Sequence, residues 1–351
     1  MYTFKENIPQ DEFDGFVSRF SFAPITQTPA WSELKTEWSG CFCGVYSKDN
    51  ELCAAALMLV RKLVSGFKLC YCPRGPLLDY TDSALVAALF DGMKTFAKNH
   101  GCYAVKFDPL IARKITPPAL DAADWSSPFP AAEHETAHRN LLEAGFVHTG
   151  YGLSLKDNIQ PRFNMIVPLA GADGEYLDEA HLRAYVGKAV RKHMGTFASN
   201  RGMYFESEKA TPEAVSELCR ILKSTEQRQQ IFLRGKAYFE RLADSFGDNA
   251  RIFFVKSKLD VYAEYLKNRM PSEQGEQLEK TRAALAQANE YIEKSGKLVT
   301  LAAALVVLPP NDSGDRMAEY LYAGSDLSDF SAFCAADGML FGILTQMQSF
   351  N

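Results

Sequence analysis

Residues 253–307 read FFVKSKLDVYAEYLKNRMPSEQGEQLEKTRAALAQANEYIEKSGKLVTLAAALVV. An apolar start gives way to two polar helical segments, about 259–268 and 273–294, and Met270-Pro271-Ser272 separates them because proline interrupts a helix. The chain then returns to a strand-like apolar run. A polar helical hairpin inserted in a globular domain buries little surface on that domain, so we expect an arm that projects outward.

The second helix of this hairpin carries a repeat. Leu278, Leu285 and Ile292 recur every seven residues, which predicts a narrow coiled-coil seam. Between residues 256 and 297 there are eight basic and seven acidic side chains, so both signs are interspersed on the outside. The pattern favours a short antiparallel coiled-coil arm at about 256–297, of the kind that contacts a large partner.

Bulk properties are those of an ordinary globular protein. The 351 residues are 47% apolar and 23% charged, and this length suffices for two domains. The formal net charge of −5 gives no overall attraction to nucleic acid, so RNA binding would need a local basic patch. The start, MYTFKENIPQDEF, lacks a secretory signal, and no apolar run is long enough to span a bilayer. We therefore expect a cytoplasmic protein without a transmembrane segment.

The eight cysteines include two close pairs, Cys41/Cys43 and Cys70/Cys72. A spacing of two places both thiols of a pair on one face of a strand. Zinc sites more often use Cys-x-x-Cys, which is absent. We expect buried, reduced thiols, with a metal site as the alternative.

The order of local signals predicts a mixed α/β fold with two domains, 1–150 and 151–351. In the first domain, Thr28-Pro29 should open a helix with Trp31, Leu34 and Trp38 on one face. Strands should follow at 41–46, 52–60, 68–72 and 103–107, with a further helix at 83–99. The second should hold strands at 163–169, 203–207 and 251–254. Its helices should lie between 178 and 201 (more than one), at 236–246, and after an opening at Thr211-Pro212. The similar order of elements suggests a structural duplication.

Common catalytic motifs are absent. The sequence has no phosphate-binding P-loop, no Rossmann glycine fingerprint, no His-Glu-x-x-His zinc helix and no Gly-x-Ser-x-Gly elbow. It also lacks the Arg/Gln-x-x-Gly-x-Gly/Ala loop that usually binds the pyrophosphate of acetyl-CoA.

A basic stretch is the first candidate site. No acidic residue occurs between Ala180 and Phe205, and the five cations there are Arg183, Lys188, Arg191, Lys192 and Arg201. They form either an anion-binding surface or a solvated helix face.

Three further residues are candidates for ligand binding. Arg234 and Tyr238 are four apart, and a guanidinium at the start of a helix suits a phosphate, although a surface ion pair is the alternative. Asp108 follows a strand and precedes Pro109, so it either binds a ligand or caps the turn.

Several segments in order resemble the Fem (FemABX) family of peptidyltransferases. They are TQTPAWSELK (26–35), YCPRGPLLDY (71–80), YAVKFDP (103–109), IQPRFNMIVPL (159–169), RQQIFLRGKAYFERL (228–242), the helical arm and YLYAGS (320–325). The resemblance implies two GNAT-like α/β domains with the coiled-coil arm inserted in the second. It implies transfer of an amino acid from aminoacyl-tRNA to the stem-peptide side-chain amine of a UDP-linked or lipid-linked muropeptide. No cofactor or metal is implied, and a lipid-linked acceptor would place the protein close to a membrane surface.

The resemblance also assigns residues. Lys35 and Arg234 are similar to residues that hold the acceptor's phosphates, and Tyr238 and Tyr322 to pocket residues near the same ligand. Asp108 matches an acidic position near the acceptor amine. The arm and the basic 183–201 stretch are the expected tRNA contacts.

The sequence departs from the family after YLYAGS. The remaining SDLSDFSAFCAADGMLFGILTQMQSFN contains neither the glycine-rich segment nor the Phe-Lys strand typical of the family, whose lysine is expected to stabilise the oxyanion. Three functions therefore remain open: an aminoacyl-tRNA-dependent transferase, truncated or divergent; a non-catalytic relative that binds muropeptide or tRNA; and a GNAT-type transferase with another acyl donor.

Overall fold

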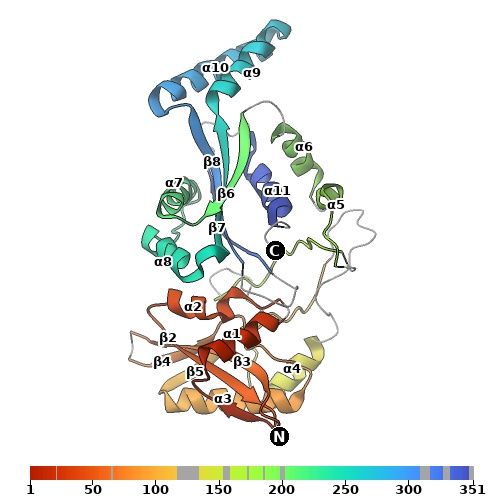
Figure 1. Ribbon diagram of the computed structural model, residues 1–351, viewed down its shortest axis with the longest axis vertical. Coiled ribbons are helices and arrows are strands. Elements are labelled where there is room, and N and C mark those ends of the chain that lie inside the picture. Colours follow the sequence, from red (N-terminus) through yellow and green to blue (C-terminus); the bar gives the residue numbers. More distant parts are fainter. Residues whose placement is uncertain are drawn as a thin grey trace. The chain divides into compact units, whose positions relative to one another are not determined.

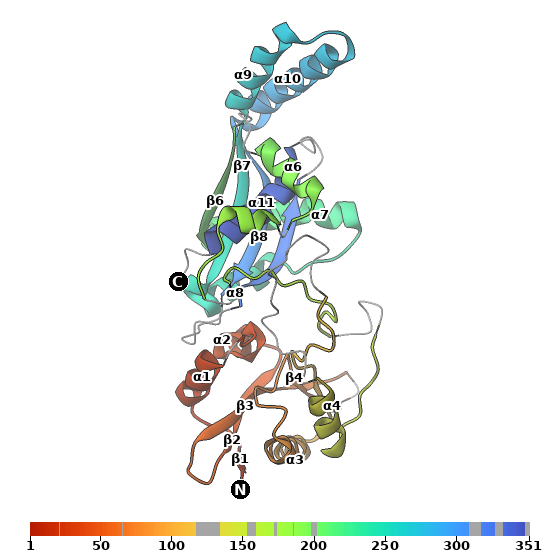
Figure 2. The same cartoon turned by 90° about the vertical axis from the view of Figure 1, so that its right-hand side faces the viewer.

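The structure is a computed structural model that describes residues 1–20, 22–64, 66–116, 134–152, 159–171, 174–184, 186–197, 202–308, 317–326 and 333–347. These residues form two compact units, one mainly before and one mainly after the junction of Pro168 and Leu169 (Figures 1 and 2). Each unit is built around one mixed or antiparallel sheet with helices, as the α/β prediction required. The predicted boundary at residue 150 stays a prediction.

The first unit contains a five-stranded sheet in the order β1-β2-β3-β4-β5, antiparallel except for the parallel pair β4 and β5. Its strands are β1 (Thr3–Lys5), β2 (Ser39–Tyr46), β3 (Leu52–Lys62), β4 (Lys68–Cys72) and β5 (Cys102–Phe107). Its helices are α1 (Gln10–Arg19), the 3₁₀ turn η1 (Ile25–Gln27), α2 (Pro29–Leu34), α3 (Ser83–Asn99) and α4 (His134–Glu143).

The two faces of this sheet bury different side chains. One face presents the four thiols of Cys41, Cys43, Cys70 and Cys72 to α3 and α4, and all four cysteines are buried and free of disulfides. For these two pairs the expected burial of the thiols is confirmed. On the opposite face the Phe42 ring stacks on Phe13 of α1, because successive residues of a strand point to opposite sides.

Helix α2 begins as its sequence predicts and ends earlier. Thr28 Oγ1 accepts the Trp31 backbone N–H at 3.2 Å, and Pro29 occupies the first helical position. The helix stops at Leu34, so the prediction that Trp38 shares its buried face is wrong. Trp38 instead follows a turn, in which its N–H donates to the Lys35 carbonyl at 2.8 Å.

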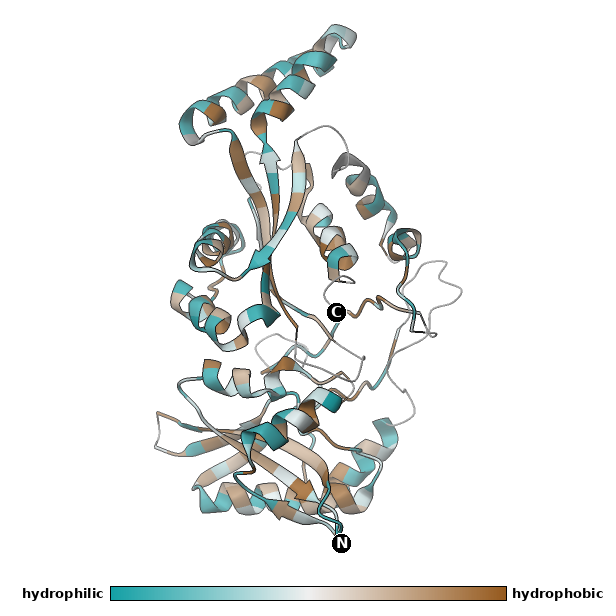
Figure 3. Ribbon diagram, in the orientation of Figure 1, coloured by the Kyte–Doolittle hydropathy of each residue, from teal (hydrophilic) through white to brown (hydrophobic). Residues whose placement is uncertain are grey.

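The second unit contains an antiparallel sheet in the order β6-β7-β8-β9, with α7 on one side and α6 and α11 on the other (Figure 1). Its strands are β6 (Met203–Lys209), β7 (Ala250–Lys258), β8 (Leu298–Val307) and β9 (Glu319–Ser325). Its helices are α5 (Glu179–Ala184), α6 (Lys188–Phe197), α7 (Pro212–Gln229), α8 (Lys236–Phe246), η3 (Gly247–Asn249), α9 (Leu259–Arg269), η4 (Met270–Ser272), α10 (Gly275–Ser295) and α11 (Ala335–Met347). The central strands β7 and β8 are apolar and almost wholly buried (Figure 3).

Helices α9 and α10 form the predicted hairpin between β7 and β8, beyond the end of their sheet (Figures 1 and 2). Thr281 and Ala288 are the fully buried side chains of α10, whereas Leu278, Leu285 and Ile292 are half-buried. Small residues thus let the two helices approach closely. The coiled-coil winding expected from the seven-residue spacing stays a prediction.

One predicted strand is wrong. Residues 163–169 form no strand, because no described strand pairs with them. The β-bridge nearest to this segment joins Ala170 to Tyr176 and is isolated. Phe163 and Met165 consequently remain 76% and 99% exposed. The helices expected between 178 and 201 are α5 and α6, with Gly187 between them, and residues 198–201 lie outside the described residues.

Across the described ranges, every helix is too short or too polar to cross a bilayer.

Candidate functional site

Asp108 lies at the end of β5 and is held by three donors. The Tyr71 hydroxyl donates to both carboxylate oxygens, at 3.1 and 2.9 Å, and the Arg74 backbone N–H donates to Oδ1 at 2.8 Å. Burial raises the pKa of Asp108, although these hydrogen bonds oppose the shift by stabilising the charged form. Burial also raises the pKa of Tyr71, which therefore stays a neutral donor.

The turn that follows β4 is fixed by a buried glutamine. Gln27 is fully buried; its Nε2 donates to the Pro73 carbonyl at 2.7 Å and its Oε1 accepts the Leu57 N–H at 2.9 Å. A Cβ on Gly75 would lie 2.5 Å from the Gln27 side chain, so only glycine fits there. The backbone of Arg74 has φ of +52°, and this strained turn aims its N–H at Asp108.

Lys35 directly follows helix α2. Its Nζ is 4.2 Å from the centroid of the Trp31 ring, a cation–π contact. Its carbonyl accepts the Trp38 N–H, and the Trp38 ring is 6.2 Å from the Tyr71 ring. Lys35 and Asp108 are therefore connected through Trp38 and Tyr71 within the first unit.

The second unit brings three predicted residues together. The guanidinium carbon of Arg234 is 5.2 Å from the Tyr238 ring centroid, and the rings of Tyr238 and Tyr322 are 6.2 Å apart at 72°. Burial raises the pKa of Tyr238, so the phenol stays neutral. Arg234 is exposed and precedes α8 by two residues, so it belongs to a loop and not to the helix face predicted for it.

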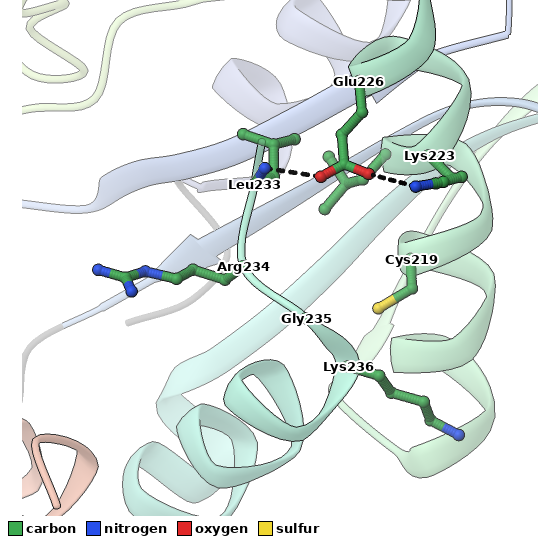
Figure 4. A pocket seen from close by; sticks show the side chains of 8 residues that line it. Cys219, Lys223, Glu226, Leu233, Arg234, Gly235 and Lys236 are labelled. Carbon is green, nitrogen blue, oxygen red and sulfur yellow. Dashed lines mark hydrogen bonds and ion pairs between the residues drawn. The ribbon is translucent and has the colours of Figure 1, made fainter. Parts of the chain in front are cut away.

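A hollow of about 320 Å³ adjoins this loop (Figure 4). Glu226 fixes the loop by accepting the Leu233 N–H at 2.6 Å and pairing with Lys223 at 3.2 Å, and these contacts lower the pKa of Glu226. Arg234 extends away from Glu226, toward the opposite side of the loop (Figure 4). Its charge is thus available to an anionic ligand.

The predicted basic stretch is only partly an open cationic surface. Arg183 is neutralised by Glu179, 2.6 Å away and one turn earlier, just outside the window without acidic residues. Lys188, Arg191 and Lys192 are exposed on α6. Arg201 lies outside the described residues. The anion-binding surface is therefore reduced to α6.

His193 fixes this helix against α11. Its ring bonds to the Asp337 carboxylate, so the buried side of α6 faces α11 and its lysines face outward.

Sequence reasoning missed Tyr71, Arg74 and Gln27. Their contacts join residues 30 to 46 positions apart, which no local spacing reveals. The available signal was their place in the segments 26–35 and 71–80 that carry the family resemblance.

Comparison with known proteins relates the chain to one protein family and to one group of named enzymes. The FemAB family model matches residues 8–276. Proteins named lipid II:glycine glycyltransferase are similar: that of Staphylococcus haemolyticus (strain JCSC1435) is 28% identical over 341 residues, covering 92% of this chain and 74% of the relative. That of Staphylococcus aureus (strain bovine RF122 / ET3-1) is 28% identical over 324 residues, covering 90% and 67%. The crystal structure of FemX shares the fold, with a TM-score of 0.73 at 22% identity over 98% of this chain and 86% of that one.

Proposed function

The chain belongs to the FemAB family, and from this membership we infer that it is an aminoacyltransferase of peptidoglycan synthesis. It moves an amino acid from aminoacyl-tRNA to the stem-peptide side-chain amine of a peptidoglycan precursor. The observation that carries this function is the match to the glycyltransferases over 92% of the chain. By the same likeness we propose glycine as the amino acid and a lipid-linked muropeptide as the acceptor.

The reaction needs no covalent intermediate on the protein. The neutral acceptor amine attacks the carbonyl carbon of the ester, and a tetrahedral oxyanion forms. The bond from this carbon to the ribose oxygen then breaks, and the proton lost by the amine ends on the ribose hydroxyl. The protein has to orient the amine, remove its proton and stabilise the oxyanion.

We assign Asp108 to the amine. A carboxylate has about four acceptor positions, so the Tyr71 and Arg74 donors leave room for one further donor. Its raised pKa brings the carboxylate closer to the range in which it accepts a proton near neutral pH. Tyr71 and the Arg74 turn hold it in place.

We assign Arg234, Tyr238, Tyr322 and Lys35 to the acceptor. The exposed guanidinium of Arg234 suits a diphosphate, and the two tyrosine rings form a rigid wall beside it. Arg234→Ala should raise the Kd for the muropeptide by about 10- to 150-fold, the loss of about 1.5–3 kcal/mol for a charged hydrogen bond. Arg19→Gln, an exposed arginine on α1, is the control; an unchanged Kd for Arg234→Ala would remove this residue from the site.

We propose α6 and the hairpin of α9 and α10 as tRNA contacts. The exposed Lys188, Arg191 and Lys192 support the first, and the projection of the hairpin beyond its sheet supports the second. We further propose that the hairpin is a short antiparallel coiled coil, that both units are GNAT-like, and that the protein acts in the cytoplasm at the membrane surface. Deleting residues 259–297, which leaves strand β7 complete, should weaken tRNA binding, and unchanged affinity would contradict the assignment of the hairpin.

One assay tests the function directly. The protein is incubated with glycyl-tRNA and lipid II, and the acceptor is examined by mass spectrometry for the gain of one glycine. UDP-linked muropentapeptide in a parallel reaction tests the choice of acceptor. Product from neither acceptor, with tRNA binding retained, would instead favour a non-catalytic relative.

A further inference from the structure

Two arginines of the first unit lie against the same exposed ring. The guanidinium carbons of Arg113 and Arg162 are 4.5 and 4.8 Å from the ring centroid of Tyr151. In the ranges that the structure describes, neither guanidinium has a carboxylate within ion-pairing distance. Two guanidiniums that share one ring repel each other, and a phosphate bound beside the ring would offset that repulsion.

Further rings extend this cluster on both sides. The Arg162 guanidinium is also 4.8 Å from the Phe163 ring, which is 76% exposed. On the other side the His148 ring is 4.6 Å from Tyr151, and His138 stacks on His148 at 5.5 Å. Exposed flat rings interleaved with arginines are the surface on which unpaired bases stack while their phosphates are neutralised.

The segments that carry this cluster adjoin the candidate catalytic carboxylate in sequence and through Arg74. Arg74 donates its backbone N–H to Asp108 and its guanidinium to the Pro161 carbonyl, at 2.8 and 2.6 Å. Arg162 follows Pro161 directly, and Arg113 follows Asp108 by five residues. Both arginines therefore lie on segments that adjoin Asp108 or the Arg74 contact beside it.

We propose that this stacking row, defined as Arg113, His148, Tyr151, Arg162 and Phe163, binds the unpaired nucleotides at the 3′ end of the aminoacyl-tRNA. The two guanidiniums hold phosphates, the exposed Phe163 ring receives a base, and the rings of Tyr151 and His148 continue the row. This assignment rests on the proposed function, because the 3′ end carries the ester that must approach Asp108. Several rings in succession fit several successive bases, whereas a UDP-linked acceptor has only one.

The test uses the full chain and an RNA minihelix with four unpaired 3′ nucleotides. Their binding is measured by fluorescence anisotropy over a range of salt concentrations. A blunt minihelix is the comparison. The wild type should prefer the overhang. Arg113→Gln should reduce the slope of log K against log salt by about 0.7, the contribution of one phosphate of a single strand. Phe163→Ala should weaken overhang binding by about 5- to 150-fold, the loss of one stacked base, without changing the slope.

The printed contact of Arg113 among the described residues is with the Tyr151 ring, so a thermal melt of Arg113→Gln has to show that the fold is retained. Arg19→Gln, on the opposite face of the sheet, is the matched control and should retain both the affinity and the slope. An unchanged slope in Arg113→Gln together with unchanged affinity in Phe163→Ala overturns the proposal. Equal losses on blunt RNA also overturn it, because they indicate general charge attraction.

Acyl transfer is measured separately. If the wild type forms product and both variants keep its KM for aminoacyl-tRNA, the stacking row is wrong and the proposed function stands. If the wild type forms no product but binds the overhang through Arg113 and Phe163, the stacking row stands and the proposed function fails.

Discussion

Replacing Gln27 by leucine should destabilise the first unit, because Gln27 substitutes for a missing strand neighbour. Strand β4 pairs with β3 only from Leu59 onward, so the Leu57 N–H has no strand partner on that side and donates to the Gln27 amide instead. Leucine has a similar volume but accepts no hydrogen bond. The change therefore removes hydrogen bonds without opening a large cavity.

The magnitude follows from the two backbone partners. The buried Leu57 N–H loses its acceptor, which costs about 1–3 kcal/mol. The Pro73 carbonyl loses one of two donors, since Thr26 Oγ1 still donates to it at 3.0 Å, and this costs about 1 kcal/mol or less. We expect the free energy of unfolding of the first unit to fall by about 2–4 kcal/mol.

Urea denaturation followed by tryptophan fluorescence measures this loss. Trp31 and Trp38 both lie in the first unit, so their fluorescence follows its unfolding. Thr26→Val is the matched control: it removes only the second donor to Pro73 and should cost about 0.5–1.5 kcal/mol. If Gln27→Leu costs no more than Thr26→Val, the amide does not hold the turn as described.

Two further predictions concern Asp108 and the packing of α3. Burial raises the pKa of Asp108 in the folded state, so the folded state binds the carboxyl proton more tightly than the unfolded chain does. The stability that this proton contributes is therefore present at low pH and is lost as pH rises through the folded-state pKa. The Asp108→Asn side chain cannot ionise, so the stability of this variant relative to the wild type should increase from about pH 4 to about pH 8 in urea titrations. Its transfer activity should be lost. A stability difference that stays constant with pH would contradict the raised pKa. Gly92→Ala would place Cβ 2.1 Å from the Phe4 ring and should lower the free energy of unfolding by about 1–3 kcal/mol, measured in thermal melts. Gly15→Ala has open space at its Cβ and should stabilise α1 by up to about 1 kcal/mol. Equal effects of the two alanines would show that the Phe4 ring moves aside freely.

Much of the fold was predictable because its signals are local. The helix at 83–99 and the start of α2 at Thr28-Pro29 follow from caps and from apolar spacing within one or two turns. The hairpin followed from a proline between two polar helical segments. The segment 163–169 failed because an alternating pattern makes a strand only when a partner is present, and the sequence does not state which segments pair.

The candidate site was predictable only in part, for a different reason. The resemblance selected Arg234, Tyr238 and Tyr322, and the structure brings these three together. Charge counting over a window marked Arg183 as free, yet Glu179 neutralises it from just outside that window. Which charges are compensated depends on side-chain geometry and not on order along the chain.

The sequence by itself determined the family, the type of most helices and strands, and the place where the hairpin is inserted, because these depend on residues a few positions apart or on ordered motifs. Only the tertiary structure decided that Gln27 and Arg74 build the turn beneath Asp108, and that Arg113 and Arg162 meet at one ring. Those contacts join residues tens of positions apart. They form because folding a sheet brings its distant strand ends and loops together, and no local pattern in the chain encodes such distances.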